Sequence, residues 1–250
     1  MPSNLDTIWL NVYNISEFRN NINNNERQCM LSLVSVNRQE KVNAKSRQSV
    51  KDNCLISGYL LEKTVKDYIK ENKAIELDRL DIALTKEGKP YLNTPDITDI
   101  EFNMSNSGDY VAVAVADKLV GIDIEECGRC DLKIANRFFS KSEISFINGL
   151  SDDYIKSFFS KCSQIAKPGM DELLTLYWTF KEAYLKFKGD GISRGLSSFD
   201  VDIKNLNVTG DESGKYYWDF TKDANYAYSL YADYKNIKRR EEDFIFKETR

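Results

Sequence analysis

The chain has 250 residues, of which 42% are hydrophobic and 12% aromatic, so it can bury the core of one large or two small domains. Its charged residues, 30% of the total, leave a formal net charge of -4, whereas a nucleic-acid binder would carry a basic excess. The sequence contains no histidine, which excludes Ser-His-Asp and Cys-His nucleophiles and HExxH metal sites.

The chain carries no signal of secretion or membrane insertion. Residues 1–6 lack the charged and apolar regions of a signal peptide, and no apolar run is long enough to span a bilayer. Five cysteines, an odd number at irregular positions, are typical of reduced thiols. We therefore expect a cytoplasmic protein that binds neither membranes nor nucleic acid. Cys127 and Cys130 have zinc-knuckle spacing but no second pair, so this segment is expected to be a loop.

The first elements of the chain are predicted to be a strand followed by helices. Residues 8–13 are rich in β-forming side chains, and the pattern turns helical over residues 26–72. Apolar side chains of the long second helix recur at intervals of three and four, and they are Val50, Cys54, Leu61, Val65, Tyr68 and Ile69. Arg38, Lys41 and Lys45 recur at similar spacing and are expected to form either a basic ridge or the more common solvated helix face.

Turns and strands follow the helical region. Lys89 lies between a glycine and a proline, which predicts that it occupies a loop tip. Residues 100–105 alternate between apolar and polar, as in a half-buried strand. We expect a polar turn over residues 105–109 and a second apolar strand over residues 110–116.

The segment Gly121–Glu125 places two carboxylates in an otherwise apolar strand. Asp123 and Glu125 are two residues apart, so both side chains point from one face of the sheet. Two oxygen donors are half of a divalent-cation site, and without histidine the expected ion is Mg²⁺. The alternative is an edge strand with a solvated acidic face, and the five residues alone do not decide between the two.

The second half of the chain repeats the order of helices and strands. A helix is predicted over residues 131–139, and Ser140 and Glu143 match the capping box that begins another. A longer helix is predicted from Glu172 to Lys188, because glycine follows it. The remaining predictions are strands over residues 199–203 and 227–232 and a solvated tail over residues 235–250.

This order of elements predicts an α+β fold made of two similar halves. We expect an N-terminal half over residues 1–117 and a C-terminal half over residues 118–250, with the active cleft between them. In the long C-terminal helix, Trp178, Glu182 and Lys186 follow at intervals of four and share one face. A Glu-Lys helix pair is common and stabilises by only about 0.2–0.5 kcal/mol, so this spacing alone does not indicate chemistry.

Four segments in this order carry a family resemblance: Phe102–Gly108, Gly121–Glu125, Phe138–Glu143 and Trp178–Lys186. Together they resemble a 4'-phosphopantetheinyl transferase of the Sfp type, with similarity from about Arg38 to Phe199. The resemblance implies a pseudo-twofold pair of halves that bind coenzyme A and Mg²⁺. It also implies transfer of the 4'-phosphopantetheine moiety to a serine of an apo acyl or peptidyl carrier protein, with release of adenosine 3',5'-bisphosphate.

The resemblance assigns roles residue by residue. It implies metal ligands at Asp123, Glu125 and Glu182. It implies coenzyme A contacts at Arg38, Lys41, Cys54, Lys89, Ser105, Asn106 and Lys186, with Cys54 near the adenine. Glu182 would take the serine proton, directly or through a water on the metal, and Lys186 would stabilise the leaving group.

Two positions depart from the family pattern, and two rival functions stay open. Asn106 replaces a histidine of the family, and Asn53 replaces an arginine. One rival is a catalytically weakened module that binds coenzyme A or a carrier protein. The other is an unrelated magnesium-dependent phosphohydrolase that shares only the carboxylates. We expect a monomer whose carrier protein serves fatty acid, polyketide or nonribosomal peptide biosynthesis, and the sequence favours none of these pathways.

Overall fold

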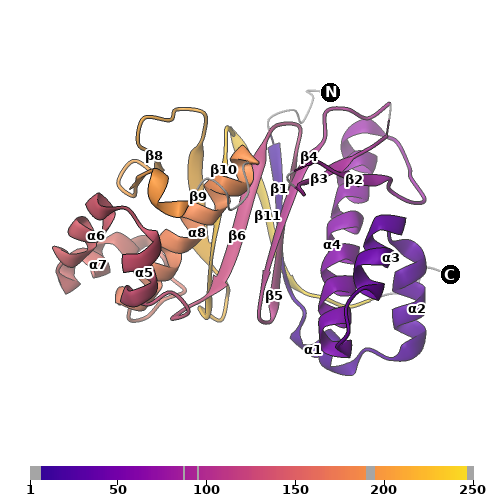
Figure 1. Ribbon diagram of the computed structural model, residues 1–250, viewed down its shortest axis with the longest axis horizontal. Helices are drawn as coiled ribbons and strands as arrows, with labels where there is room; N and C mark the ends of the chain where they lie inside the picture. Colours follow the sequence, from indigo (N-terminus) through magenta and orange to yellow (C-terminus); the bar gives the residue numbers. More distant parts are fainter. Residues whose placement is uncertain (1–6, 87, 95, 190–194, 247–250) are drawn as a thin grey trace. The chain divides into compact units, whose positions relative to one another are not determined.

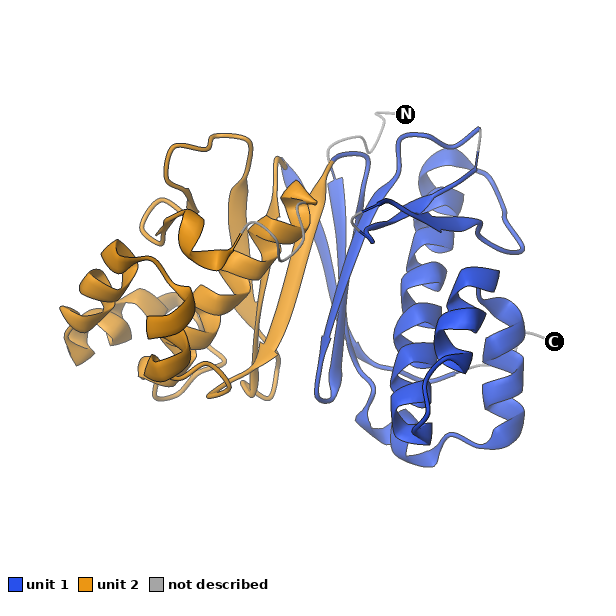
Figure 2. Cartoon of the chain, viewed as in Figure 1, with its two compact units in different colours: residues 1–118, 235–250 blue, residues 119–234 orange. Residues whose placement is uncertain are grey.

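The computed structural model describes residues 7–86, 88–94, 96–189 and 195–246 (Figure 1). The chain forms two compact units, residues 1–118 with 235–250 and residues 119–234 (Figure 2). Each unit combines helices with a mainly antiparallel sheet, which confirms the α+β class. The expected division into residues 1–117 and 118–250 did not include the return of residues 235–250 to the first unit. No helix within the described ranges is long and apolar enough to cross a membrane.

The first unit packs helices on a four-stranded sheet of order β11-β1-β5-β4. Its helices are α1 (Ser16–Asn21), α2 (Asn24–Leu33), α3 (Val36–Asn43) and α4 (Gln48–Lys73). Its strands are β1 (Thr7–Asn14), β2 (Ile82–Leu84), β3 (Pro90–Leu92), β4 (Glu101–Ser107), β5 (Tyr110–Ala116) and β11 (Asn236–Asp243). The predicted apolar stripe of α4 is buried at Leu61, Val65, Tyr68 and Ile69. Val50 is 41% exposed, so the stripe begins later than predicted.

The predicted polar turn over residues 105–109 is wrong. Strand β4 continues to Ser107, because residues 105–107 pair with Ala112, Val111 and Tyr110 of β5. The turn is confined to Gly108 and Asp109, and Gly108 has a φ of 51°, which a residue without a Cβ adopts at little cost. The polar side chains of this segment therefore belong to a strand, where neighbours alternate between faces.

The prediction of a solvated tail is also wrong. Residues Asn236–Asp243 form β11, which pairs in parallel with β1 along its full length, from Thr7 to Asn14. The charged side chains of β11 are typical of a solvated tail, but charge is also a common way to protect an edge strand from pairing with other chains. Lys238 lies over the ring of Trp9 at 4.2 Å, so even these charges make specific contacts.

The second unit contains a three-stranded sheet of order β6-β10-β9 and a separate pair, β7-β8. Its helices are α5 (Leu132–Phe138), α6 (Lys141–Asn148), α7 (Asp152–Phe158) and α8 (Met170–Lys188), with 3-10 turns η1 (Phe159–Lys161) and η3 (Leu196–Ser198). Its strands are β6 (Val120–Glu126), β7 (Val201–Asp202), β8 (Asn207–Val208), β9 (Lys215–Phe220) and β10 (Tyr226–Ala232). Strand β9 had not been predicted.

The ends of α6 and α8 follow the sequence closely. At the start of α6 the capping box is confirmed, with Ser140 Oγ accepting from Glu143 N and Glu143 Oε2 accepting from Ser140 N. Helix α8 begins at Met170 rather than Glu172, because the Glu172 carboxylate caps the N–H of Gly169. It ends at Gly189 with a φ of 75°, as the glycine predicted.

Helix α8 packs directly on β6 and β10, and one glycine permits the close approach. A Cβ at Gly121 would overlap the carbonyl oxygen of Ala183 and the backbone nitrogen of Phe187. Both atoms belong to the helix backbone, which cannot move aside as a flexible side chain can. Gly121 thus sets how near the face of β6 lies to α8.

We expect Gly121→Ala to lower the free energy of unfolding by about 1–3 kcal/mol, because the added methyl overfills this contact. Gly149→Ala is the control, since the nearest atom to its added Cβ would be Phe146 O at 3.5 Å, an ordinary contact. The control should change stability by less than about 1 kcal/mol. Urea unfolding measures both, and equal effects would show that the close approach does not constrain the fold.

Candidate functional site

Strand β6 presents its carboxylates to α8. Asp123 lies opposite Ser229 of β10, whose hydroxyl is hydrogen-bonded to Thr179 of α8 at 2.6 Å. Asp123 is only 3% exposed, so the alternative of a solvated acidic face does not hold for it. Glu125, two residues further, is half-buried at the end of the same face.

The facing stripe of α8 supplies a carboxylate and a cation. Trp178, Glu182 and Lys186 are all half-buried, as expected for residues on one helix face at the edge of a core. The sequence suggested a pair between Glu182 and Lys186. In the structure, Lys186 Nζ donates to Asp123 Oδ1 at 2.7 Å, so the cation links the helix to β6.

The three carboxylates influence one another electrostatically. Burial raises the pKa of Glu182, and the negative charges of Asp123 and Glu125 raise it further, while Lys186 opposes the shift. Since like charges are close in a poorly solvated place, this end of β6 and α8 favours a cation. Lys186 is one such cation.

The donor chemistry fits Mg²⁺, although a complete metal centre is not preassembled. Within the described ranges, no group of three or more His, Cys, Asp and Glu side chains is arranged to hold a metal ion. Mg²⁺ prefers oxygen and is commonly held by one or two carboxylates together with waters and substrate phosphates. Asp123 and Glu182 can serve such a shared site, because they lie where negative charge accumulates.

An arginine next to the carboxylates was missed by the sequence analysis. Arg129, in the turn after β6, places Nε 3.2 Å from Glu126 Oε2 and Nη1 3.9 Å from Glu125 Oε2. Glu125 and Arg129 also line a pocket of about 190 Å³ with Cys130, Ile134 and Trp178. The four-residue spacing from Glu125 is informative only in a helix, so it gave no signal in this turn.

In the first unit, three of the expected coenzyme A contacts lie together. Arg38 of α3 packs on Gly58 of α4, where a Cβ would overlap its side chain. Its guanidinium Nη1 lies 3.9 Å from the Cys54 sulfur. Desolvation and then the charge of Arg38 lower the pKa of Lys41. Two neighbouring cations that repel each other favour an anionic ligand.

The other expected contacts are arranged less simply. Lys89 Nζ donates to Glu101 Oε2 at 3.0 Å, so an incoming phosphate would compete with this carboxylate. Ser105 is buried and Asn106 is exposed, because they are successive residues of β4 and point to opposite faces. The structure therefore does not present them from one turn, as the sequence analysis expected.

Two family models match nearly the whole described chain. The model described as 4'-phosphopantetheinyl transferase superfamily matches residues 119–241, and the one described as 4'-phosphopantetheinyl transferase, N-terminal, matches residues 21–118. The two matches meet where the two units meet in the sequence, at Lys118 and Leu119.

Individual proteins with the same description are similar over much of the chain. The 4'-phosphopantetheinyl transferase psf-1 of Bacillus pumilus is 36% identical over 57% of this chain and 54% of its own length. The 4'-phosphopantetheinyl transferase Sfp of Bacillus subtilis (strain 168) is 29% identical over 71% of this chain and 70% of its own. A further 4'-phosphopantetheinyl transferase of Bacillus subtilis is 30% identical, over 72% of this chain and 71% of its own. The chain belongs to the 4'-phosphopantetheinyl transferase family and is of the Sfp type.

Proposed function

We propose that the chain transfers the 4'-phosphopantetheine moiety of coenzyme A to a serine of an apo acyl or peptidyl carrier protein. The reaction is magnesium-dependent and releases adenosine 3',5'-bisphosphate. The observation that supports this most is the meeting of β6 and α8, where Lys186 contacts Asp123 and where burial and the charges of Asp123 and Glu125 raise the pKa of Glu182. Relatives named 4'-phosphopantetheinyl transferase support the reaction class.

Residues of the second unit take different roles in the reaction. When bound by Asp123, Glu125 and Glu182, Mg²⁺ would neutralise charge on the phosphate oxygens. The serine oxygen forms a bond to the phosphorus that carries pantetheine, and the bond from that phosphorus to the bridging oxygen breaks. Glu182 accepts the serine proton, and the Lys186 ammonium stabilises the negative charge that develops on the leaving bisphosphate.

The residues of the first unit bind the nucleotide end of coenzyme A. Arg38, Lys41 and Lys89 supply positive charge for its phosphates, and Cys54 contacts the adenine. Ser105 and Asn106 donate neutral hydrogen bonds. The support is the lowered pKa of Lys41, caused by burial and then by the charge of Arg38, together with the family resemblance at these positions. Activity then requires residues of both units.

The thiols and the net charge bear on where the enzyme acts and on its partners. Cys29, Cys54, Cys127, Cys130 and Cys162 are all free thiols, which supports a reducing, cytoplasmic environment. A formal net charge of -4 favours neither nucleic acid nor an anionic membrane as a partner. The enzyme acts as a monomer, and its carrier serves fatty acid, polyketide or nonribosomal peptide biosynthesis.

Mass spectrometry of an apo carrier protein tests the proposed reaction. The chain is incubated with coenzyme A and each carrier, with Mg²⁺ or with a chelator. We expect the carrier to gain the mass of phosphopantetheine only when Mg²⁺ is present. Binding of coenzyme A without a mass gain would instead support a weakened binding module, for which Asn53 and Asn106 are the motivation.

We expect Asp123→Asn and Glu182→Gln to lower turnover by at least about 100-fold, since each removes a charge that would hold the metal. Both substitutions keep the shape of the side chain, so thermal unfolding midpoints should stay near that of the unmodified chain. Asp153→Asn is the matched control, because the Asp153 side chain is 97% exposed and lies elsewhere on the unit. Full turnover in either site variant at saturating Mg²⁺ would contradict the carboxylate site.

Substitutions of the site lysines should affect different kinetic parameters. Lys41→Ala and Lys89→Ala should raise the KM for coenzyme A more than they lower kcat, because contacts remote from the reacting bond supply uniform binding. Lys186→Ala should mainly lower kcat. Lys70→Ala is the control, since Lys70 forms an exposed pair with Glu76. The assigned roles would be wrong if all three site variants changed KM and kcat in the same proportion.

A further inference from the structure

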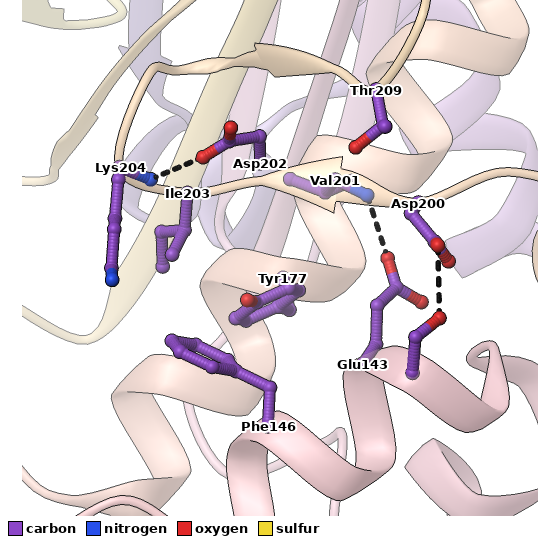
Figure 3. A pocket seen from close by; sticks show the side chains of 10 residues that line it. Glu143, Phe146, Tyr177, Asp200, Val201, Asp202, Ile203, Lys204 and Thr209 are labelled. Atoms are coloured by element: carbon purple, nitrogen blue, oxygen red, sulfur yellow. Dashed lines mark hydrogen bonds between the residues drawn. The ribbon is translucent and has the colours of Figure 1, made fainter.

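The second unit contains a pocket that the transfer reaction does not use. It has a volume of about 260 Å³ and lies between α6, α8 and the segment around β7 (Figure 3). Phe146, Tyr177 and Ile203 supply apolar walls, and Asp200, Asp202 and Lys204 supply charges. None of these residues belongs to the carboxylate site or to the coenzyme A contacts.

Tyr177 offers this pocket a polar group that has no partner. Its side chain is 1% exposed, and within the described ranges its hydroxyl makes no hydrogen bond. Figure 3 shows the rings of Tyr177 and Phe146 facing the same space, with the hydroxyl turned toward Ile203. The hydroxyl is open to the pocket rather than sealed in the core, so a ligand that hydrogen-bonds to it gains a contact that contributes about 0.5–1.5 kcal/mol.

The charges around the pocket are unevenly balanced. Glu143 Oε1 accepts from Lys181 Nζ at 2.7 Å and from Val201 N at 2.8 Å, so its charge is already compensated. Asp200 accepts a hydrogen bond from the Ser142 hydroxyl at 2.8 Å. Asp202 accepts hydrogen bonds from the backbone of Lys204 and from Asn205, which leave its charge in place. Of the described lining residues Lys204 alone is a cation, so with Glu143 paired to Lys181 the carboxylates keep an excess of one negative charge.

The pKa of the Tyr177 hydroxyl reflects the same excess of negative charge. Burial raises the pKa of its hydroxyl, and the negative charges of Glu143, Asp202 and Asp200 raise it further. The hydroxyl therefore stays protonated at neutral pH, where it can donate or accept. The carboxylates and the faces of the aromatic rings both attract cations. The pocket therefore favours a ligand that joins a positive charge to an apolar group.

We propose that this pocket binds a small primary amine carried on an aromatic ring. The ring packs between Phe146, Tyr177 and Ile203, and the ammonium lies on the side of Asp200 and Asp202. The Tyr177 hydroxyl accepts one of its hydrogen bonds. Pockets for drug-sized ligands measure about 300–1,000 Å³, so this smaller one holds a single ring with a short side chain.

Calorimetric titration of the full chain with 2-phenylethylamine and with its neutral analogue 2-phenylethanol tests the proposal. We expect the amine to bind at least about 10-fold more tightly, because only the amine forms charge-assisted hydrogen bonds. Coenzyme A and carrier protein are left out, so the result is independent of the transfer reaction. Equal affinities, or no binding of the amine, would overturn the proposal.

The affinities of single-residue variants for 2-phenylethylamine show whether it binds in this pocket. Tyr177→Phe and Asp200→Asn should each weaken the amine by about 3- to 10-fold, since each removes one polar contact. Lys204→Gln, at an exposed position, should tighten it by about 2-fold because it removes a like charge. Tyr91→Phe, in the first unit, is the matched control and should bind as the unmodified chain does. If Lys204→Gln and Tyr177→Phe both leave the affinity unchanged, the amine does not bind in this pocket.

Discussion

The candidate active site depends on the close packing of β6 against α8. Gly121 lets the strand approach the helix backbone at Ala183 and Phe187, which a side chain would prevent. The same strand face then carries Asp123 into contact with Lys186, one turn beyond Glu182. Loss of this approach would separate the strand carboxylates from the helix, even if every charged residue were kept.

That packing brings carboxylates close together, and the Lys186 ammonium offsets part of their repulsion. Burial raises the pKa of Glu182, and repulsion from the charges of Asp123 and Glu125 raises it further. The Lys186 ammonium, 2.7 Å from Asp123, offsets part of the negative charge. A metal ion bound together with phosphate oxygens would also offset the charge of the carboxylates. The Lys186 ammonium would then be available to contact the phosphate.

Local signals in the sequence predicted local structure well. The capping box at Ser140 and the glycine after α8 are confirmed, because each acts within one turn of backbone. The tail was mistaken for a solvated end, since its pairing with β1 joins residues at opposite ends of the chain. Likewise, helical spacing suggested that Lys186 pairs with Glu182, whereas its contact with Asp123 depends on the tertiary approach at Gly121.

Manganese binding, measured by water-proton relaxation in the presence of coenzyme A, tests most directly whether β6 and α8 form a divalent-cation site. Mn²⁺ shares the oxygen preference of Mg²⁺ and is detectable at low occupancy. The account predicts that Asp123→Asn weakens binding by about 10-fold or more. It also predicts that Lys186→Met tightens binding, because the competing ammonium is gone. Equal affinity in the unmodified chain and both variants would contradict the account.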